Sequence, residues 1–312
     1  MLRNTVAHVA ALFLCLSTAL CAGNIVSTND DGWAVAQIRA LYTDLTSAGF
    51  EVVLSAPTQN ESGTGSSTKT PEPLSEPCEY DSCPSGSPAE GYNVSNPNLN
   101  YVNAYPVDAV QYGIQTLAPK FFSGAGPEFV SSGPNIGNNL GIAALGSGTI
   151  GAACEAAKEG IPATAFAGDS GSQVSYTTLD SDPTATSTQA AWIYAALTVQ
   201  YTEALFAAGS DPLLPPGIIV SVNYPSISNC SDASDYKWVL ARNLWDPFAS
   251  DFAACPSDGS VLPTEGHVVG TEGCYNSVAV LNATTKLDVD ATLQGEVYSR
   301  LRELPFSCLP SS

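Results

Sequence analysis

Two adjacent carboxylates, Asp30 and Asp31, lie between a short apolar run and Gly32. Neighbouring carboxylates repel each other unless a cation lies between them or water screens their charges. A pair of this kind can therefore hold a divalent metal ion. The commoner explanation of an isolated Asp-Asp-Gly is a solvated acidic turn. The pair becomes a candidate metal site only if the rest of the chain supplies further oxygen ligands.

The scarcity of histidine restricts the kind of metal site that this chain can build. Of two histidines, His8 lies in a predicted signal sequence, which leaves only His267 in the mature chain. Multi-histidine zinc sites are therefore excluded. A metal must be held mainly by oxygen atoms, which favours Mg²⁺ or Mn²⁺ and also allows Ca²⁺.

Residues 1–22 have the pattern of a secretory signal peptide. Arg3 lies in a short basic start, Val9–Leu16 is apolar, and small residues end near Ala22. The apolar run is too short to span a bilayer. No other segment is apolar enough to do so. The sequence thus predicts a secreted, extracellular protein that does not bind membranes.

The charge balance is strongly acidic. The chain has ten lysines and arginines and thirty aspartates and glutamates, which gives a net charge of −20. Removal of the signal takes away Arg3 and no acidic residue, so the net charge becomes −21. Such a charge opposes binding to nucleic-acid polymers and anionic membranes. A small phosphorylated substrate would need a local positive centre. With so few basic side chains, a metal ion is the better source of that charge.

Cysteine usage supports an oxidising compartment. Seven cysteines remain after the signal, and most are expected to pair. We predict a local bridge between Cys78 and Cys83 and a free, buried thiol at Cys154 in an alanine-rich helical stretch. The sequence leaves open the pairing of Cys230, Cys255, Cys274 and Cys308. Sequons predict a glycoprotein and occur at Asn60, Asn93, Asn229 and Asn282.

The elements around the acidic pair predict a βαβ unit. Ile25–Thr28 is a predicted strand, Trp33–Ala48 has helical spacing, and Glu51–Ser55 is a second strand. The acidic pair then lies at the carboxyl end of the first strand, where open α/β sheets bind ligands. The polar stretch 58–70 follows the second strand, so a binding loop is at least as well supported as a flexible linker.

The alternation of strands and helices continues along the chain and predicts one α/β sheet. Residues 71–100 are interpreted as a surface excursion, and after Pro225 the pattern loosens. Further predicted strands are Tyr101–Ala104, Phe129–Ser131, Pro162–Ala167, Gly217–Asn223 and Ser277–Leu281. Further predicted helices are Pro106–Leu117, Ala152–Glu159, Ala190–Ala207 and Asp288–Leu304.

Two loops could bind an anion or complete a metal site. In the Asn/Gly loop Ser132–Gly141, Asn135 and Asn139 offer oxygens to a metal and N–H groups to an oxyanion. Downstream, the turn Ser147-Gly148-Thr149 opens a helix, where unpaired N–H groups and hydroxyls can hold a phosphate. Turn-forming asparagines and an ordinary capped helix are the alternative explanations.

Two other motifs carry less weight. Gly146–Gly151 matches GxGxxG, but it follows no clear strand and lacks the later acidic residue, which disfavours a cofactor-binding oxidoreductase. Gly168–Gly171 reads GDSG, as in chymotrypsin-like proteases. Those enzymes place their histidine before this motif, and the only earlier histidine lies in the signal. We therefore exclude that chemistry.

Taken in order, six stretches resemble the motifs of the SurE family, which comprises metal-dependent phosphatases and 5′/3′-nucleotidases. They are STNDDGW, APTQNESGTGSS, YPVDAV, SSGPNIGNNLG, GSGTIGAACEA and IIVSVNYP. The chain looks like a secreted eukaryotic member of the acid-phosphatase branch. The resemblance covers about Asn24 to Pro225 and thins over the C-terminal part.

The resemblance implies roles for particular residues. The residues that correspond to the family's metal ligands are Asp30, Asp31, Ser62 and Asn135. Those that correspond to its phosphate-contacting groups are Asn139, Ser147, Gly148 and Thr149. Asp108 matches an aspartate with a structural role. Gly146 stands where the family often has tyrosine, so the pocket wall and substrate choice are expected to differ. A glycan on Asn60 would crowd Ser62, so we expect that sequon to be unoccupied.

The resemblance also implies a fold and an activity. We expect a three-layer, Rossmann-like α/β fold, with a signal at 1–22, a core at 23–225 and an α+β extension at 226–312 that completes the same domain. The expected activity is hydrolysis of small phosphate monoesters, such as nucleoside monophosphates, by metal-activated water, with Asp30 and Asp31 as catalytic carboxylates. The sequence leaves open whether one aspartate instead attacks phosphorus directly. The alternative is a catalytically inert secreted binding protein that keeps the fold. A homodimer is compatible with either.

Overall fold

Nine strands form one mostly parallel sheet in residues 23–255 and 261–310, the part of the chain that the computed structural model describes. The predicted signal lies outside the described residues. The strands are β1 (Asn24–Thr28), β2 (Glu51–Pro57), β3 (Glu90–Asn93), β4 (Asn96–Val102), β5 (Phe129–Ile136), β6 (Ala163–Gly168), β7 (Ile218–Tyr224), β8 (Lys237–Ala241) and β9 (Tyr275–Asn282).

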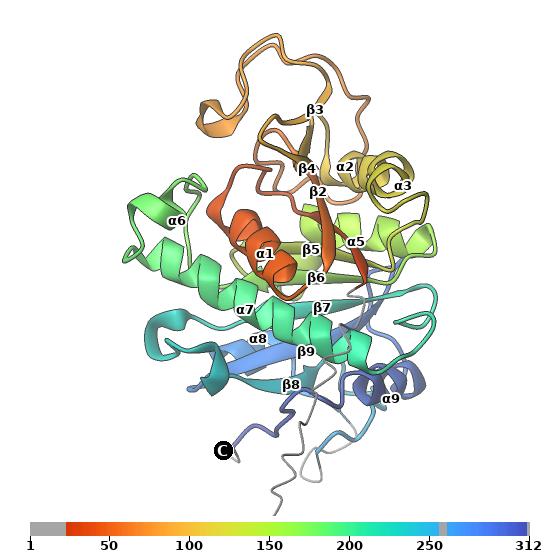
Figure 1. The fold of residues 1–312 in the computed structure, drawn as a ribbon. Helices are drawn as coiled ribbons and strands as arrows, with labels where there is room; N and C mark the ends of the chain where they lie inside the picture. The colour runs from red at the N-terminus through yellow and green to blue at the C-terminus, as the bar shows by residue number, and fades with distance from the viewer. Residues whose placement is uncertain (1–22, 256–260, 311–312) are drawn as a thin grey trace, which may run out of the picture.

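The order across the sheet is β3-β4-β2-β1-β5-β6-β7-β9-β8. Only the pairs β3–β4 and β7–β9 are antiparallel. Helices cover both faces (Figure 1). They are α1 (Ala36–Ser47), α2 (Pro106–Tyr112), α3 (Ala118–Phe121), α4 (Ala143–Gly146), α5 (Gly148–Lys158), α6 (Thr178–Ser181), α7 (Thr186–Ala207), α8 (Glu265–Gly270) and α9 (Ala291–Arg300). A π-helical segment, Gly113–Leu117, joins α2 to α3.

The three layers follow from the alternation of apolar side chains along the central strands. On β1, Ile25 packs in the cluster that contains α1 and α7, whereas Val26 packs in the cluster that contains α2 and α5. Phe129 and Val130 divide in the same way on β5. Successive side chains of a strand point to opposite faces, so a continuous apolar run is buried on both sides. The predicted three-layer α/β fold is confirmed.

The sheet brings several loops to one edge. β1 lies between β2 and β5 and is parallel to both. The chain runs from β1 to β2 on one side and returns from β4 to β5 on the other side, which makes the carboxyl ends of β1 and β5 a topological switch point. Asp30 and Asp31 follow β1 directly, as predicted from the sequence.

Some boundaries differ from prediction. β5 continues to Ile136, past the Gly133-Pro134 pair that was expected to begin a loop, and its pairing with β6 shifts register between Ser132 and Asn135. An irregularity of this kind accommodates a proline that cannot donate to the ladder. The surface excursion expected at 71–100 is wrong for its second half, which forms β3 and much of β4.

The C-terminal part adds strands to the same sheet. β9 pairs antiparallel with β7, and β8, which was not predicted, pairs with β9. The predicted bridge Cys78–Cys83 and the buried free thiol of Cys154 are confirmed. The cysteines whose pairing was open form the bridges Cys230–Cys274 and Cys255–Cys308. Among the described residues, no helix combines the length and apolar character needed to cross a bilayer.

Candidate functional site

Asp30 is held by the N-terminus of α5. The Thr149 N–H donates to Asp30 Oδ2 at 3.0 Å, and the Thr149 hydroxyl donates to Oδ1 at 2.5 Å. The positive end of a helix favours a carboxylate at this place. The contact also requires a glycine, since a Cβ on Gly148 would lie 2.9 Å from Asp30 Cβ. Asp30 is only 2% exposed.

Asp31 points to a different pair of donors. The Ile136 N–H at the end of β5 donates to Asp31 Oδ2 at 2.9 Å, and Gln173 Nε2 donates to Oδ1 at 2.6 Å. Burial and the neighbouring charge of Asp30 raise the pKa of Asp31 well above its ordinary value. Burial also raises the pKa of Asp30, against the hydrogen bonds from Thr149.

Neither aspartate forms an ion pair with a lysine or arginine in the described residues. Asn135, the residue before Ile136, adds a free oxygen. Its Nδ2 donates to the Gly137 carbonyl at 2.6 Å, while its buried Oδ1 has no hydrogen-bond partner among the described residues. Two buried carboxylates without a counter-ion and an unused amide oxygen form a donor set that suits Mg²⁺, Mn²⁺ or Ca²⁺.

The loop that contains Ser62 contacts the backbone of Asp30. The Ser62 side chain itself forms no hydrogen bond with the acidic pair. The N–H of Glu61 donates to the Asp30 carbonyl at 2.7 Å. Ser62 itself is exposed, and its N–H donates to Asn60 Oδ1 at 2.9 Å. The far end of the loop is fixed by Asp108, which accepts from the Lys69 N–H at 2.8 Å. The role of Ser62 as a metal ligand stays a prediction.

The expected phosphate-contacting residues divide into two groups. Both donors of Thr149 are used by Asp30. The Ser147 oxygen caps α5 by accepting from the Ile150 N–H at 3.1 Å, which leaves its hydroxyl hydrogen free to donate. The buried Nδ2 of Asn139 has no partner among the described residues. Asn139 and Ser147 therefore have the donors that a phosphate could use.

The profile of a family described as "Survival protein SurE" matches residues 25–244. The chain belongs to the SurE family. It is 32% identical over 301 residues to an acid phosphatase of Yarrowia lipolytica, covering 87% of this chain and 82% of that protein. It is 33% identical over 205 residues to the 5′-nucleotidase SurE of Lawsonia intracellularis, covering 66% and 67%.

A solved structure supports the fold of this SurE-family chain. The crystal structure of SurE from Aquifex aeolicus superposes with a TM-score of 0.56 at 21% identity, over 88% of this chain and 98% of that one. This likeness concerns the fold alone. It agrees with the predicted SurE-like sheet.

Two residues near the acidic pair escaped the sequence analysis. Gln173 follows the carboxyl end of β6, so the strand-end rule could have drawn attention to it. Glu79 gives no such signal, because its loop reaches the site from the Cys78–Cys83 bridge. Its Oε1 accepts from the Ala34 N–H at 3.2 Å and occupies the space where a Cβ on Gly32 would lie. Burial raises the pKa of Glu79 to about 8.

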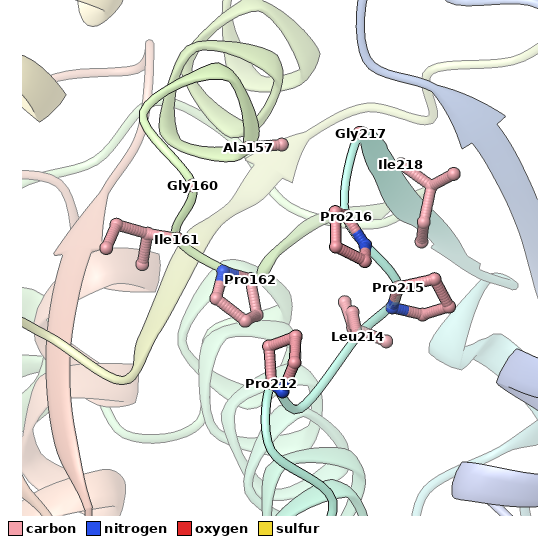
Figure 2. Close-up of a pocket in the computed structure, with 10 residues that line it drawn as sticks. All are labelled: Ala157, Gly160, Ile161, Pro162, Pro212, Leu214, Pro215, Pro216, Gly217 and Ile218. Atoms are coloured by element: carbon pink, nitrogen blue, oxygen red, sulfur yellow. The ribbon is translucent and has the colours of Figure 1, made fainter.

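A small cavity of this SurE-family chain lies away from the acidic pair. It lies where β6 and β7 begin, at the opposite edge of the sheet from the acidic pair (Figure 2). It is lined by apolar residues, many of them prolines. Ile161 and Pro162 come from the segment before β6, and Pro215 and Pro216 come from the segment before β7. It offers no titratable group.

Proposed function

We propose that this SurE-family chain is a secreted phosphomonoesterase of the acid-phosphatase or nucleotidase type. One observation carries the proposal: Asp30 and Asp31 are buried and form no ion pair among the described residues, and Asp31 accepts from Ile136, whose chain neighbour Asn135 has an unpartnered Oδ1 there. The names of the acid phosphatase and 5′-nucleotidase relatives support the same activity. The signal pattern and three disulfides support secretion.

A divalent cation is the expected cofactor. The residues that would hold Mg²⁺, Mn²⁺ or Ca²⁺ are Asp30, Asp31, Ser62 and Asn135. When bound, the ion would supply the positive charge that polarises phosphoryl oxygens and lowers the pKa of water. Such charge is otherwise scarce in a chain with a net charge of −20.

The chain's own residues orient the ligands and the substrate. Thr149 holds Asp30, while Ile136 and Gln173 hold Asp31, so the two carboxylates keep separate directions. Donors fixed before the reaction stabilise developing charge without reorganising. We assign this role to the Asn139 amide and the Ser147 hydroxyl, directed at the phosphoryl oxygens of a small substrate such as a nucleoside monophosphate.

The test is Asp30→Asn. Asparagine keeps the size of the side chain but removes its charge, so release of phosphate from a nucleoside monophosphate or p-nitrophenyl phosphate should fall at least about a hundredfold. Circular dichroism should show an unchanged fold. Asp180→Asn, which alters an exposed carboxylate, is the matched control.

If the Asp30→Asn protein kept wild-type activity, the proposed function would be contradicted. A wild-type protein that binds Mn²⁺ but releases no phosphate from a panel of monoesters would instead support the inert binding protein.

A further inference from the structure

The segment between β5 and α5, residues 137–147, contains Asn139 and Ser147 but is largely half-buried or exposed. Its position is fixed from outside by the C-terminal half of the chain. The first tie is at Asn139, whose N–H donates to Asn223 Oδ1 at 2.8 Å. Asn223 Nδ2 in turn donates to Glu265 Oε1 at 2.9 Å. Asn223 and Glu265 are both fully buried.

Glu265 fixes the direction of the Asn223 amide. Its Oε1 also accepts from the hydroxyls of Ser221 at 3.1 Å and Ser277 at 3.2 Å. Asn223 Nδ2 donates to Glu265 Oε1. The other end of the amide, Asn223 Oδ1, therefore points toward Asn139 and accepts from its N–H. The backbone of Glu265 is anchored as well, since its N–H donates to the Arg242 carbonyl at 2.8 Å.

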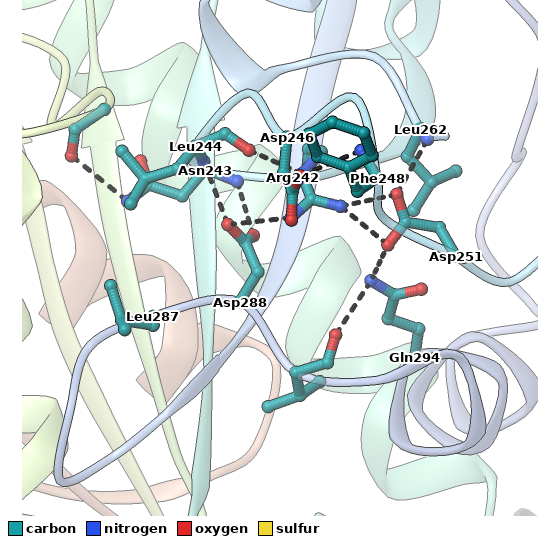
Figure 3. A network of polar contacts seen from close by, with 12 residues as sticks. Arg242, Asn243, Leu244, Asp246, Phe248, Asp251, Leu262, Leu287, Asp288 and Gln294 are labelled. Atoms are coloured by element: carbon teal, nitrogen blue, oxygen red, sulfur yellow. Dashed lines mark hydrogen bonds and ion pairs between the residues drawn. The ribbon is translucent and has the colours of Figure 1, made fainter. Parts of the chain in front are cut away.

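The second tie holds Gly141. Asn243 Nδ2 donates to the Gly141 carbonyl at 3.1 Å, and the Asn243 N–H donates to Asp288 Oδ1 at 2.6 Å. Figure 3 shows Asn243 and Asp288 beside a buried ion pair, in which Arg242 Nη1 lies 2.7 Å from Asp251 Oδ2. Arg242 Nη1 donates to both oxygens of Asp251, and such buried charge-assisted hydrogen bonds are stronger than neutral ones. Asn243 follows Arg242 in the chain, so these buried contacts also fix the position of Asn243.

The third tie lies close to α5. Lys286 Nζ donates to the Leu145 carbonyl at 3.0 Å, and Lys286 is only 7% exposed. Three separate segments, namely β7 and the chain after β8 and after β9, thus hold residues 137–147 at Asn139, Gly141 and Leu145. An ordinary exposed loop has no such set of buried partners.

We propose that Glu265 and Asn243 are positioning residues that hold the 139–141 segment where Asn139 can donate to a phosphoryl group. The inference rests on the proposed function. It gives the C-terminal residues, including α8 beyond the residues that the family profile matches, an indirect role in substrate binding.

The test compares two substitutions of Glu265 with a control. Glu265→Gln keeps an oxygen acceptor and should retain wild-type kcat/KM. Glu265→Leu removes the acceptor and frees the Asn223 amide, so kcat/KM should fall about tenfold, as for the loss of one hydrogen bond. The inhibition constant of inorganic phosphate should rise in parallel. Ser277→Ala removes another hydrogen bond to the same oxygen and should leave both quantities unchanged.

Two further readouts separate positioning from general destabilisation. The thermal shift produced by Mn²⁺ should be the same in Glu265→Leu and wild type, because Asp30 and Asp31 are untouched. In a double-mutant cycle, Asn223→Leu added to Glu265→Leu should cause no further loss of kcat/KM, since both act through one chain of bonds.

Additive effects in the cycle, or equal losses in Glu265→Leu and Ser277→Ala, would overturn the inference. A wild-type protein without turnover would overturn the proposed function instead. If Glu265→Leu does not fold, Asn243→Ala replaces it: hydrogen exchange over 137–147 should then be faster than in wild type, and unchanged exchange would contradict the inference.

Discussion

Asp30 and Asp31 are neighbours in sequence but belong to different hydrogen-bond systems. Asp30 is bound to the N-terminus of α5, and Asp31 is bound to the end of β5 and to Gln173. Each carboxylate thereby keeps a fixed direction. Burial of both raises their pKa values and makes their joint ionisation costly. The divalent cation proposed above would offset this cost.

A different buried carboxyl, Glu265, makes the stability of the metal-free protein depend on pH. Burial, with an added effect of the Asp288 charge, raises the pKa of Glu265 from an ordinary 4.5 to about 8, against the hydrogen bonds from Asn223, Ser221 and Ser277. Between these values the folded protein keeps a proton that the unfolded chain releases. The contribution of Glu265 to the free energy of unfolding therefore falls as pH rises from about 5 to about 8.

Glu265→Gln should remove that contribution. In EDTA, its free energy of unfolding from urea titrations should fall less steeply over this pH range than that of wild type. Glu272→Gln, which alters an exposed carboxylate of the same C-terminal part, should keep the wild-type slope. Parallel slopes for wild type and Glu265→Gln would show that Glu265 is already ionised in the folded protein.

Individual site residues differ in how far the sequence could indicate them. Asp30, Asp31 and Asn135 follow or end parallel strands, so strand prediction alone places them at one edge of the sheet. The use of Thr149 by Asp30 could not be foreseen, because a helix N-terminus binds a side chain and a phosphate by the same N–H groups. Glu79 depends on the path of a disulfide-bridged loop, which periodicity does not reveal.

At the scale of elements, the contact between α5 and the turn after β1 is very close. A Cβ on Gly148 would lie 2.9 Å from Asp30 Cβ and 3.0 Å from Pro106 Cγ. The Cβ added in Gly148→Ala should push α5 away from the turn that contains Asp30. The free energy of unfolding should fall by about 1–3 kcal/mol. Phosphatase activity should also fall, because Asp30 is displaced.

Gly126→Ala is the matched control, because Gly126 is exposed and a Cβ there meets no atom within 4 Å. Urea unfolding measures the change in stability, and initial rates measure the change in activity. Equal stability and activity of the Gly148→Ala and Gly126→Ala proteins would show that the close approach is not required.

The elements of the core were largely predictable; in the C-terminal part β9 and α9 were predicted, but β8 and α8 were not. Continuous apolar runs identify β1, β5, β6 and β7, because strands buried on both faces need no polar alternation. β8 and α8 are short and lie between polar stretches, so their pattern is weak. The length of β5 was missed because Gly-Pro ordinarily marks a turn.

On the scale of the whole molecule, one edge of the sheet gathers loops from both halves of the chain. The acidic turn after β1 contacts the carboxyl end of β5 and the N-terminus of α5. The C-terminal part holds residues 137–147, which connect β5 to α5. The division into a core at 23–225 and an extension at 226–312 stays a prediction. It understates the connection, since Asn223, Asn243 and Glu265 act on the same segment.

The most direct test of the metal-site hypothesis is phosphate release before and after metal removal. Wild-type protein, stripped with EDTA and dialysed, should lose release of phosphate from a nucleoside monophosphate, since its buried carboxylates then lack the charge that the substrate requires. Added Mg²⁺ or Mn²⁺ should restore the rate. Full turnover by the metal-free protein would contradict the account.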